Sequence, residues 1–249
     1  MLSTVERGEG PPVVLVHGFT QNAATWWPLV EPLEQTNRLV ALDAPGHGGS
    51  AEIEADLAGG ADLMVASVPA AAAWIGYSMG GRYALHAALR HPGAIRRLVL
   101  VSTTGGIDDA EERAARRRSD AALADRVESE GVAAFIAWWA AQPMFSTLNP
   151  QAARVEDRVA RASAAGLASS LRLAGAGSQR PLWEGLPAIE IPTLVIAGAL
   201  DKKYVGLSER IVDTVGPNAE LHVVPGAGHA CHLERPEEFI RTVRDFLMP

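Results

Sequence analysis

The sequence has one cysteine, Cys231, in 249 residues, which excludes an intramolecular disulfide and is typical of a reducing compartment. No apolar run reaches the roughly 18 residues of a membrane-spanning helix, and residues 1–8 lack the apolar centre of a signal peptide. Positive charge is also scarce: 22 Lys and Arg stand against 29 Asp and Glu, which gives a net charge of −7 at pH 7. An acidic chain is not expected to use nucleic acid as its main partner. We therefore expect a soluble, cytoplasmic protein without nucleic-acid or membrane partners, whose oligomeric state the sequence does not define.

Alternating strand and helix patterns run through most of the chain. With 48% hydrophobic residues, 249 residues can bury one large core and still carry an inserted subdomain. Helical patterns, the last of them at residues 236–247, separate most of the apolar runs. This alternation predicts an α/β protein whose mostly parallel sheet is covered by helices on both faces. The predicted strands are residues 13–16, 38–43, 72–75, 97–101, 193–198 and 220–224.

Residues 105–187 interrupt this alternation with helical patterns only. A helical insertion after a strand of a parallel sheet lies over the carboxyl ends of the strands, so we expect a cap above the site. The predicted organisation is an α/β core of residues 1–104 and 188–249 with a helical cap of residues 105–187. The cap helices are predicted to begin at 108–113 and to include residues 131–141, 151–165 and 167–174.

A Gly-x-Ser-x-Gly motif, Gly76-Tyr77-Ser78-Met79-Gly80, stands between a predicted strand and a predicted helix at residues 80–90. A serine there lies on a turn too tight for bulky neighbours, which gives both glycines a steric role. The turn lifts the hydroxyl above the sheet at a helix N-terminus, where developing negative charge is favoured. Because the motif alone is common, the strand and helix around it are what make Ser78 a candidate nucleophile or base-activated hydroxyl.

A catalytic serine needs a base, and the base needs an acid that fixes its tautomer. Asp201 follows the strand at 193–198 and His229 follows the strand at 220–224, so both lie at the sheet edge where Ser78 lies. The order Ser, Asp, His is the order expected for this type of sheet. Taken singly, Asp201 could be a turn residue and His229 a loop histidine. Three such residues at one edge, in this order, favour a catalytic triad.

Two backbone N–H groups are predicted to form an oxyanion hole. One belongs to Phe19, in the segment after the first predicted strand, and the other to Met79, directly after the nucleophile. Three other histidines near these motifs are interpreted as structural: His17 and His47 as loop residues, and His232 as a residue packed near a helix start. The sequence contains no metal-ligand cluster.

Several motifs together resemble one family. Through His17-Gly18-Phe19-Thr20, residues 43–50 and the elbow around Ser78, the chain resembles the α/β-hydrolase superfamily along nearly its whole length. Three further features narrow the match: Arg82 after the elbow glycines, the run from Glu111 to Arg118 in the cap, and Asp201-x-Lys203-Tyr204. With them the sequence resembles the 2-succinyl-6-hydroxy-2,4-cyclohexadiene-1-carboxylate synthases of menaquinone biosynthesis. The resemblance implies an α/β-hydrolase fold and a lyase that expels pyruvate from a tricarboxylated cyclohexene, with a serine-hydrolase triad and without a metal or organic cofactor.

Arginines near the candidate nucleophile indicate an anionic substrate. Arg82 lies four residues after it, about one helical turn along the same face. A site for a polyanion would use this cation, since guanidinium groups match carboxylates bidentately. Arg113, Arg116 and Arg117 lie within about one turn of each other on the first cap helix, so at least one is expected to face the site. The alternative is that they form solvated pairs with Glu112 or Asp120. The resemblance favours Arg116 as a substrate-binding residue, followed by Arg113.

Further side chains complete the predicted binding site. Trp138 and Trp139 offer either an aromatic wall or plain core, and the resemblance favours Trp139. Tyr77 and Lys203 are expected to line the site. The predicted substrate is a small anionic tricarboxylate, which the resemblance implies to be 2-succinyl-5-enolpyruvyl-6-hydroxy-3-cyclohexene-1-carboxylate. The alternatives are a carboxylesterase or carbon–carbon bond hydrolase with the same triad, and a non-enzymatic ligand receptor.

Overall fold

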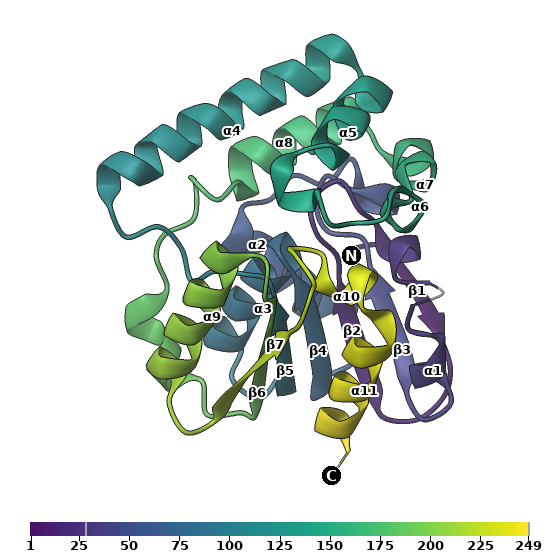
Figure 1. Cartoon of the computed structure of the whole chain (residues 1–249), viewed down its shortest axis with the longest axis vertical. Coiled ribbons are helices and arrows are strands. Elements are labelled where there is room, and N and C mark those ends of the chain that lie inside the picture. The colour runs from purple at the N-terminus through teal and green to yellow at the C-terminus, as the bar shows by residue number, and fades with distance from the viewer. Residues whose placement is uncertain (28, 249) are drawn as a thin grey trace.

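Seven strands form one mostly parallel sheet within the residues that the computed structural model describes, 1–27 and 29–248 (Figure 1). Residues 28 and 249, which belong to the predicted core segments, lie outside the described residues. The strand order is β1-β3-β2-β4-β5-β6-β7, and only β1 of these strands is antiparallel to its neighbour. The predicted α/β class is thereby confirmed. The strands are β1 (Thr4–Arg7), β2 (Pro12–Val16), β3 (Arg38–Leu42), β4 (Ala72–Tyr77), β5 (Ile95–Val101), β6 (Thr193–Gly198) and β7 (Ala219–Val224).

Strand β1 was not predicted from the sequence pattern. It lies at the edge of the sheet, where Val5 stands opposite Ala41 of β3. Its Glu6 forms an exposed ion pair with Arg38 at 2.6 Å. Backbone pairing with β3, rather than burial of its own side chains, holds this strand in place. Hydrophobic periodicity therefore gives no signal for it.

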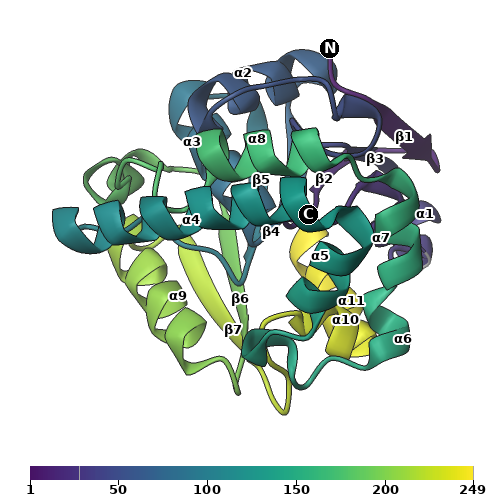
Figure 2. The same cartoon turned by 90° about the horizontal axis from the view of Figure 1, so that it is seen from above.

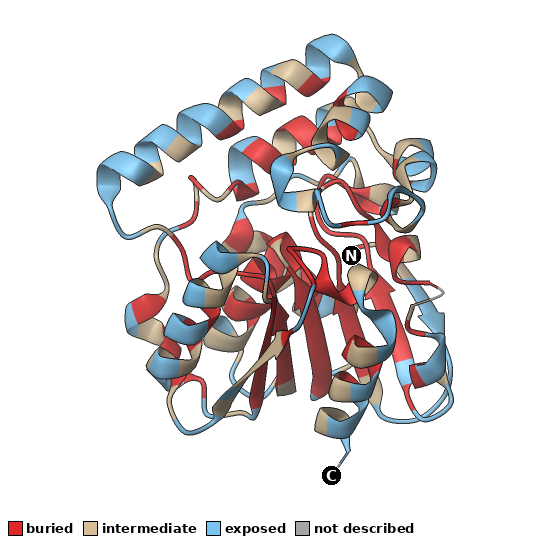
Figure 3. Cartoon of the chain, in the orientation of Figure 1, coloured by how far each residue is buried: buried red, intermediate tan, exposed pale blue. Residues whose placement is uncertain are grey.

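Two apolar clusters hold helices on the two faces of the sheet. Successive strand residues point to opposite faces, so Val14 and Val16 belong to one cluster while Val13 and Leu15 belong to the other. Figure 3 shows that the buried residues are concentrated in the central strands. The first cluster includes residues of α2, α3 and α9, and the second includes residues of α1, α10 and α11. The helices of this part are η1 (Ala23–Trp26), α1 (Glu31–Glu34), η2 (Gly48–Ser50), α2 (Leu57–Ser67), α3 (Met79–Arg90), α9 (Lys202–Val215), α10 (Cys231–Glu234) and α11 (Pro236–Leu247).

A separate layer of helices lies above the sheet, as Figures 1 and 2 show from two directions. Helix α4 packs against α8 and α5, and Phe135, Ile136 and Leu167 form a third apolar cluster among these helices. Helix α4 begins within the predicted residues 108–113, and its first turn is capped because the side chain of Asp109 accepts the N–H of Glu112 at 2.8 Å. The helices of the layer are α4 (Ala110–Glu130), α5 (Val132–Ala140), η3 (Pro143–Phe145), α6 (Pro150–Ala153), α7 (Val155–Arg161) and α8 (Ala164–Ala174).

The prediction of a single helix over residues 151–165 is wrong. The chain breaks at Arg154, whose φ of +49° is left-handed and separates α6 from α7. The Arg154 guanidinium donates to the backbone carbonyl of Trp27 in the core and pairs with Asp157 at 2.6 Å. A second break follows at Ser163, whose side chain caps α8. A contact with the core, which the local sequence does not encode, thus determines where this helix divides.

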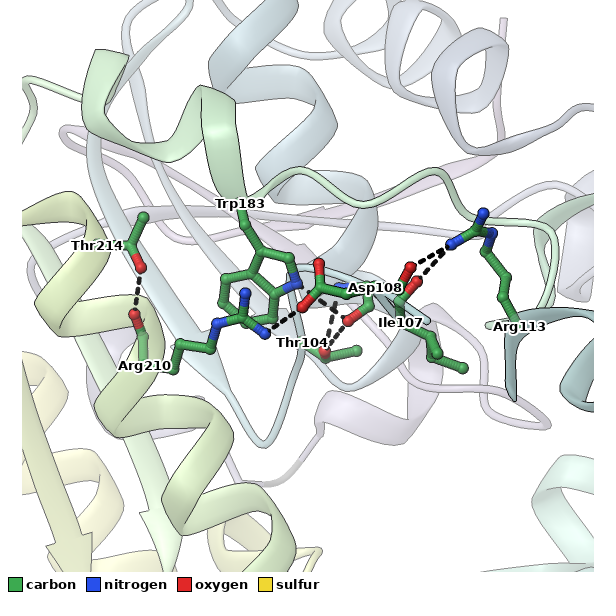
Figure 4. Close-up of polar contacts among 8 residues, drawn as sticks. Thr104, Ile107, Asp108, Arg113, Trp183, Arg210 and Thr214 are labelled. Atoms are coloured by element: carbon green, nitrogen blue, oxygen red, sulfur yellow. Dashed lines mark hydrogen bonds and ion pairs between the residues drawn. The ribbon is translucent and has the colours of Figure 1, made fainter. Parts of the chain in front are cut away.

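The helical layer is attached to the core where its two connecting segments run side by side. In the second segment, which contains η4 (Trp183–Ala188), the indole Nε1–H of Trp183 donates to the carbonyl of Gly106 in the first at 3.2 Å. The guanidinium of Arg210 on α9 stacks 3.8 Å from the Trp183 ring and pairs with Asp108 at 2.5 Å (Figure 4). One core arginine therefore contacts both connecting segments.

The close approach of α3 to β2 generates a test of the fold. A Cβ atom on Gly80 would lie 2.1 Å from the carbonyl oxygen of Val16, so Gly80→Ala should lower the free energy of unfolding by about 1–3 kcal/mol or more. Gly206→Ala is the matched control, because nothing lies within 4 Å of its added Cβ in α9. That control should be neutral or stabilising by up to about 1 kcal/mol. Urea unfolding of both variants checks this, and equal stabilities would contradict the packing described.

Candidate active site

Ser78 lies at the turn between β4 and α3, in a backbone conformation that few residues adopt. Its φ is +51° and its ψ is −108°. Two hydrogen bonds from neighbouring strand ends hold it: Ser78 N–H donates to the Val101 carbonyl at 2.8 Å, and the Thr103 hydroxyl donates to the Ser78 carbonyl at 2.8 Å. A Cβ on Gly76 would lie 2.6 Å from the carbonyl of Gly80. The turn thus requires the glycines of the motif and presents the serine side chain at the sheet edge.

The structure brings Ser78, His229 and Asp201 together in one hydrogen-bonded chain. The Ser78 hydroxyl lies 3.2 Å from Nε2 of His229, and Nδ1 of His229 lies 2.8 Å from Oδ2 of Asp201. With the proton on Nδ1, His229 donates to the carboxylate and leaves Nε2 free to accept from the serine. Asp201 is itself fixed, since its other oxygen accepts the Tyr204 N–H at 3.3 Å where α9 begins. This geometry can activate the serine hydroxyl.

Aromatic rings enclose the imidazole of His229, which is 1% exposed. The ring of Tyr204 lies 4.4 Å away, that of Tyr77 5.6 Å and that of Phe145 5.8 Å, each between centroids. Tyr204 and Phe145 were not among the predicted site residues. Tyr204 had a signal in the sequence, the aromatic position that follows Asp201-x-Lys203, whereas Phe145 comes from the helical layer and had none.

Phe19 and Met79 line the same cavity as Ser78, and neither N–H donates a hydrogen bond to any described residue. The loop that carries Phe19 is held by a hydrogen bond from Gly18 N–H to the side chain of Gln21 at 3.1 Å. Two free N–H groups beside a nucleophile are the arrangement that stabilises an oxyanion.

His17 and His47 lie beneath this loop and have structural surroundings, as predicted. His17 Nε2 accepts the N–H of Ala44 at 3.1 Å and its Nδ1 lies 2.8 Å from the Gly18 carbonyl, so the neutral Nδ1–H tautomer satisfies both contacts. Burial lowers the pKa of His17 and lowers that of His47 to about 3. Both rings are therefore neutral supports of the loop. His232 is buried against Tyr77 with its pKa lowered to about 3, again mainly by burial.

A cavity of about 480 Å³ opens between the sheet edge and the helical layer. Of the predicted binding residues, Arg82, Arg116, Trp139 and Lys203 line it. Its wall also contains polar groups that sequence reasoning missed, because they come from loops and helices without a recognisable motif. These are Thr103, Thr104, Ser119, Gln142 and Ser170.

Arg82 is buried and is not paired with any carboxylate among the described residues. One of its terminal nitrogens donates to the carbonyl of Ala174 at 2.7 Å. Burial lowers the pKa of its guanidinium, whereas the nearby Tyr204 and Tyr83 hydroxyls oppose this shift. A buried cation without a carboxylate partner, in the wall of a cavity, is suited to bind an anion.

The three arginines of the first helical turns in the layer take different positions. Arg116 lines the cavity, with its Nε bonded to Asp120 at 2.7 Å. Arg113 does not line it: its guanidinium donates to the carbonyls of Ile107 and Asp108 (Figure 4). Arg117 Nε reaches the carbonyl of Gly177 at 3.3 Å. One arginine of the run therefore faces the site, and the structure does not bring Arg113 to it.

Tyr77 is also outside the cavity wall. Its ring lies beneath the triad, 4.1 Å from the His232 ring, and a Cβ on Gly18 would lie 2.7 Å from it. Burial raises the pKa of its hydroxyl well above the usual value. Tyr77 thus supports the loop of Gly18 and the ring of His229 from below.

Arg158 on α7 is a buried cation that the sequence analysis missed. Its Nη1 lies 3.4 Å from the hydroxyl of Thr20, and its Nε has no partner among the described residues. Burial lowers its pKa. The spacing of the sequence could have identified this residue. Val155, Val159 and Ala162 form the apolar face of the same helical stretch. Arg158 lies three residues after Val155 and four residues before Ala162, on that face. An arginine on such a face indicates a polar environment opposite it.

The described residues contain no cluster of three or more His, Cys, Asp or Glu side chains that could hold a metal ion. Within the same residues, no helix is both long and apolar enough to cross a membrane.

Comparisons with known proteins agree on one family. Residues 13–242 match the alpha/beta hydrolase family. A Klebsiella pneumoniae protein named 2-succinyl-6-hydroxy-2,4-cyclohexadiene-1-carboxylate synthase is 34% identical over 255 residues, which cover 98% of this chain and 98% of that protein. A protein of the same name from Escherichia coli O157:H7 is 34% identical over 244 residues, covering 95% and 94%.

Solved structures extend the comparison to three dimensions. MenH from S. aureus has a TM-score of 0.92 and 27% identity, covering 99% of this chain and 98% of that one. A malate-bound thermophilic esterase from Thermogutta terrifontis has a TM-score of 0.84 and 27% identity, covering 99% and 92%. The overall fold is therefore shared by proteins whose names describe different reactions.

The hydrogen-bonded chain of Ser78, His229 and Asp201 predicts a specific kinetic pattern. Ser78→Ala, His229→Ala and Asp201→Asn should each lower kcat by orders of magnitude with little change in unfolding free energy. Because the three groups act as one unit, the double variants should be hardly slower than the more impaired single variant. Steady-state kinetics of all singles and doubles measure this. Losses that multiply in the doubles would contradict the assignment of a triad.

Proposed function

Because this chain belongs to the alpha/beta hydrolase family, and within it to the 2-succinyl-6-hydroxy-2,4-cyclohexadiene-1-carboxylate synthases, we propose how its residues eliminate pyruvate from 2-succinyl-5-enolpyruvyl-6-hydroxy-3-cyclohexene-1-carboxylate. The chain is an enzyme of menaquinone biosynthesis, a lyase that acts on a small molecule. The roles of individual residues, the charge recognition of the substrate and the cytoplasmic location are parts of the proposal.

The observation that carries the proposal is the presence of two arginines in the same cavity as Ser78. The substrate has three carboxylates, whereas the protein has a net charge of −7, so long-range attraction by the whole protein does not recruit it. Local cations must do so. Arg82 and Arg116 supply them, with Lys203 as a third positive charge in the wall of the cavity.

In the proposed reaction the triad acts as a base rather than as a nucleophile. The ring proton next to the succinyl carbonyl passes to the hydroxyl oxygen of Ser78 as its own proton moves to Nε2 of His229. Asp201 holds the imidazole in the required tautomer and stabilises the imidazolium that forms. The resulting negative charge on the carbonyl oxygen is held by the N–H groups of Phe19 and Met79.

Electron flow from this enolate completes the elimination. The electron pair re-forms the carbonyl, shifts the ring double bond and breaks the carbon–oxygen bond to the enolpyruvyl group. The leaving group departs as the enolate of pyruvate and takes up a proton to give pyruvate. The ring becomes the cyclohexadiene, and the proton on His229 returns to solvent or to the leaving group. No step requires a group that the chain itself does not provide.

A serine esterase is the alternative that the same triad and oxyanion hole could serve. The malate-bound esterase of T. terrifontis shows that this fold carries ester hydrolysis in a similar structure. A neutral ester, however, makes no use of a buried, carboxylate-free arginine beside the serine. Arg82 therefore favours the lyase.

We further propose that residues 105–187 act as a cap over the cavity. Arg116, Trp139 and Gln142 of this segment line one side of the cavity, and Ser78 and Arg82 of the remainder line another. Substrate held between two such parts is shielded from water when they close.

The lyase and the esterase predict different effects of the arginines. Each bidentate arginine–carboxylate pair in a partly desolvated site should contribute about 2–4 kcal/mol, or about 30- to 1,000-fold in kcat/KM. Arg82→Ala and Arg116→Ala should therefore strongly slow pyruvate release from the tricarboxylate, and lysine at either position should restore only part of the rate. Hydrolysis of a neutral aryl ester should change little in the same variants. Equal losses on the two substrates would assign these arginines a structural role and remove the support for the proposal.

The cap makes a prediction that hydrogen exchange can check. If residues 105–187 open as a unit, the amides of α4 and α5 should exchange at a lower opening free energy than those of β2 and β5. A bound tricarboxylate should slow exchange in the cap more than in the sheet. Protection of the cap equal to that of the sheet, with and without ligand, would show that the two parts form one rigid unit.

A further inference from the structure

Asp120 is a carboxylate in the wall of a cavity that we assign to an anionic substrate, which is an unexpected place for a negative charge. Its side chain is 1% exposed, and both of its oxygens are bonded. Oδ1 accepts Nε of Arg116 at 2.7 Å, and Oδ2 accepts the backbone N–H of Gly177 at 2.9 Å. A buried carboxylate beside the binding site repels an anionic substrate. Its two contacts must therefore favour substrate binding by more than this repulsion opposes it.

The contact with Arg116 uses Nε and leaves the two terminal nitrogens of the guanidinium free. Only Nε of Arg116 is bonded among the described residues, and the arginine side chain remains 38% exposed, so its two terminal nitrogens are available for a carboxylate fork. A long arginine side chain on a helix surface would otherwise lose rotamer freedom on binding. Asp120 removes that freedom before the substrate arrives.

The contact with Gly177 ties α4 to the segment that follows α8. A Cβ on Gly175 would lie 2.6 Å from Oδ2 of Asp120, and one on Gly177 would lie 2.2 Å from the backbone of Arg117. The segment can therefore approach α4 this closely only with glycine at these two positions. The same segment begins at Ala174, whose carbonyl holds Arg82. The two cavity arginines are thus linked through one carboxylate and one short stretch of backbone.

We propose that Asp120 is a positioning residue for substrate binding, which acts by holding the guanidinium of Arg116 in place while its second oxygen is anchored by the backbone of Gly177. The inference rests on the proposed function, because it assumes that Arg116 binds a substrate carboxylate. Asp120 itself contacts no reacting atom. Its effect should therefore appear in substrate binding and be lost when Arg116 is absent.

A double-mutant cycle tests this. Asp120→Asn should raise KM for the tricarboxylate and lower kcat/KM by about 10-fold, a coupling of the size found within hydrogen-bonded networks. It should leave hydrolysis of a neutral aryl ester unchanged. In the Arg116→Ala background, the further loss caused by Asp120→Asn should be less than about 2-fold. Asp125→Asn is the matched control, since Asp125 lies on the same helix and pairs with Arg172 in solvent; it should change neither reaction.

Different results overturn the positioning role of Asp120 and the proposed function. A loss from Asp120→Asn that persists in the Arg116→Ala background, or that affects both substrates equally, overturns the positioning role. If Asp120→Asn does not fold, the cycle is run with Asp120→Glu, and failure of both to fold also overturns it, since Asp120 would then hold the fold itself. The proposed function fails on a different result: Arg116→Ala alone affecting the tricarboxylate and the ester equally.

Discussion

The contact between helix α3 and the end of strand β2 is the close packing on which the position of Ser78 depends. Gly80 lies so close to the carbonyl of Val16 that no side chain fits between them. This contact places Ser78, at the start of α3, beside the loop that carries Phe19. The Ser78 hydroxyl and the N–H groups of Phe19 and Met79 are therefore brought together by this packing interaction, and the positive φ of Ser78 is stabilised by the hydrogen bonds around it.

The protein has a net charge of −7, yet three cationic side chains, Arg82, Arg116 and Lys203, line the cavity of Ser78. Arg82 is desolvated and has a backbone carbonyl rather than a carboxylate as its partner, so it retains most of its capacity to attract an anion. Arg116 is paired with Asp120, but through Nε alone, and neither of its terminal nitrogens has a hydrogen-bond partner among the described residues. Because both lie in the cavity of Ser78, the proposed function has the binding energy of the substrate carboxylates orient the proton next to the serine hydroxyl.

Much of this arrangement could be predicted from the sequence, and the exceptions have physical causes. The ends of buried parallel strands can be predicted because such strands are continuous apolar runs in the sequence. Ser78, Asp201 and His229 could therefore be assigned to one sheet edge. Which of Arg113 and Arg116 faces the cavity could not be read from their spacing, since carbonyl groups of the connecting segment bind Arg113. Tyr77 adjoins the nucleophile in sequence but points beneath the triad. Strand β1 and the break at Arg154 depend on tertiary contacts with β3 and Trp27, which local patterns do not contain. The catalytic and binding roles themselves stay predictions.

The central claim is that this triad performs an elimination on a tricarboxylate. The most direct measurement is to incubate the purified wild-type protein with 2-succinyl-5-enolpyruvyl-6-hydroxy-3-cyclohexene-1-carboxylate and to follow pyruvate, with a neutral aryl ester measured in parallel. The account predicts that pyruvate forms far faster than in the absence of protein, with kcat/KM well above that for the ester. Pyruvate release at the uncatalysed rate, together with efficient ester hydrolysis, would contradict it.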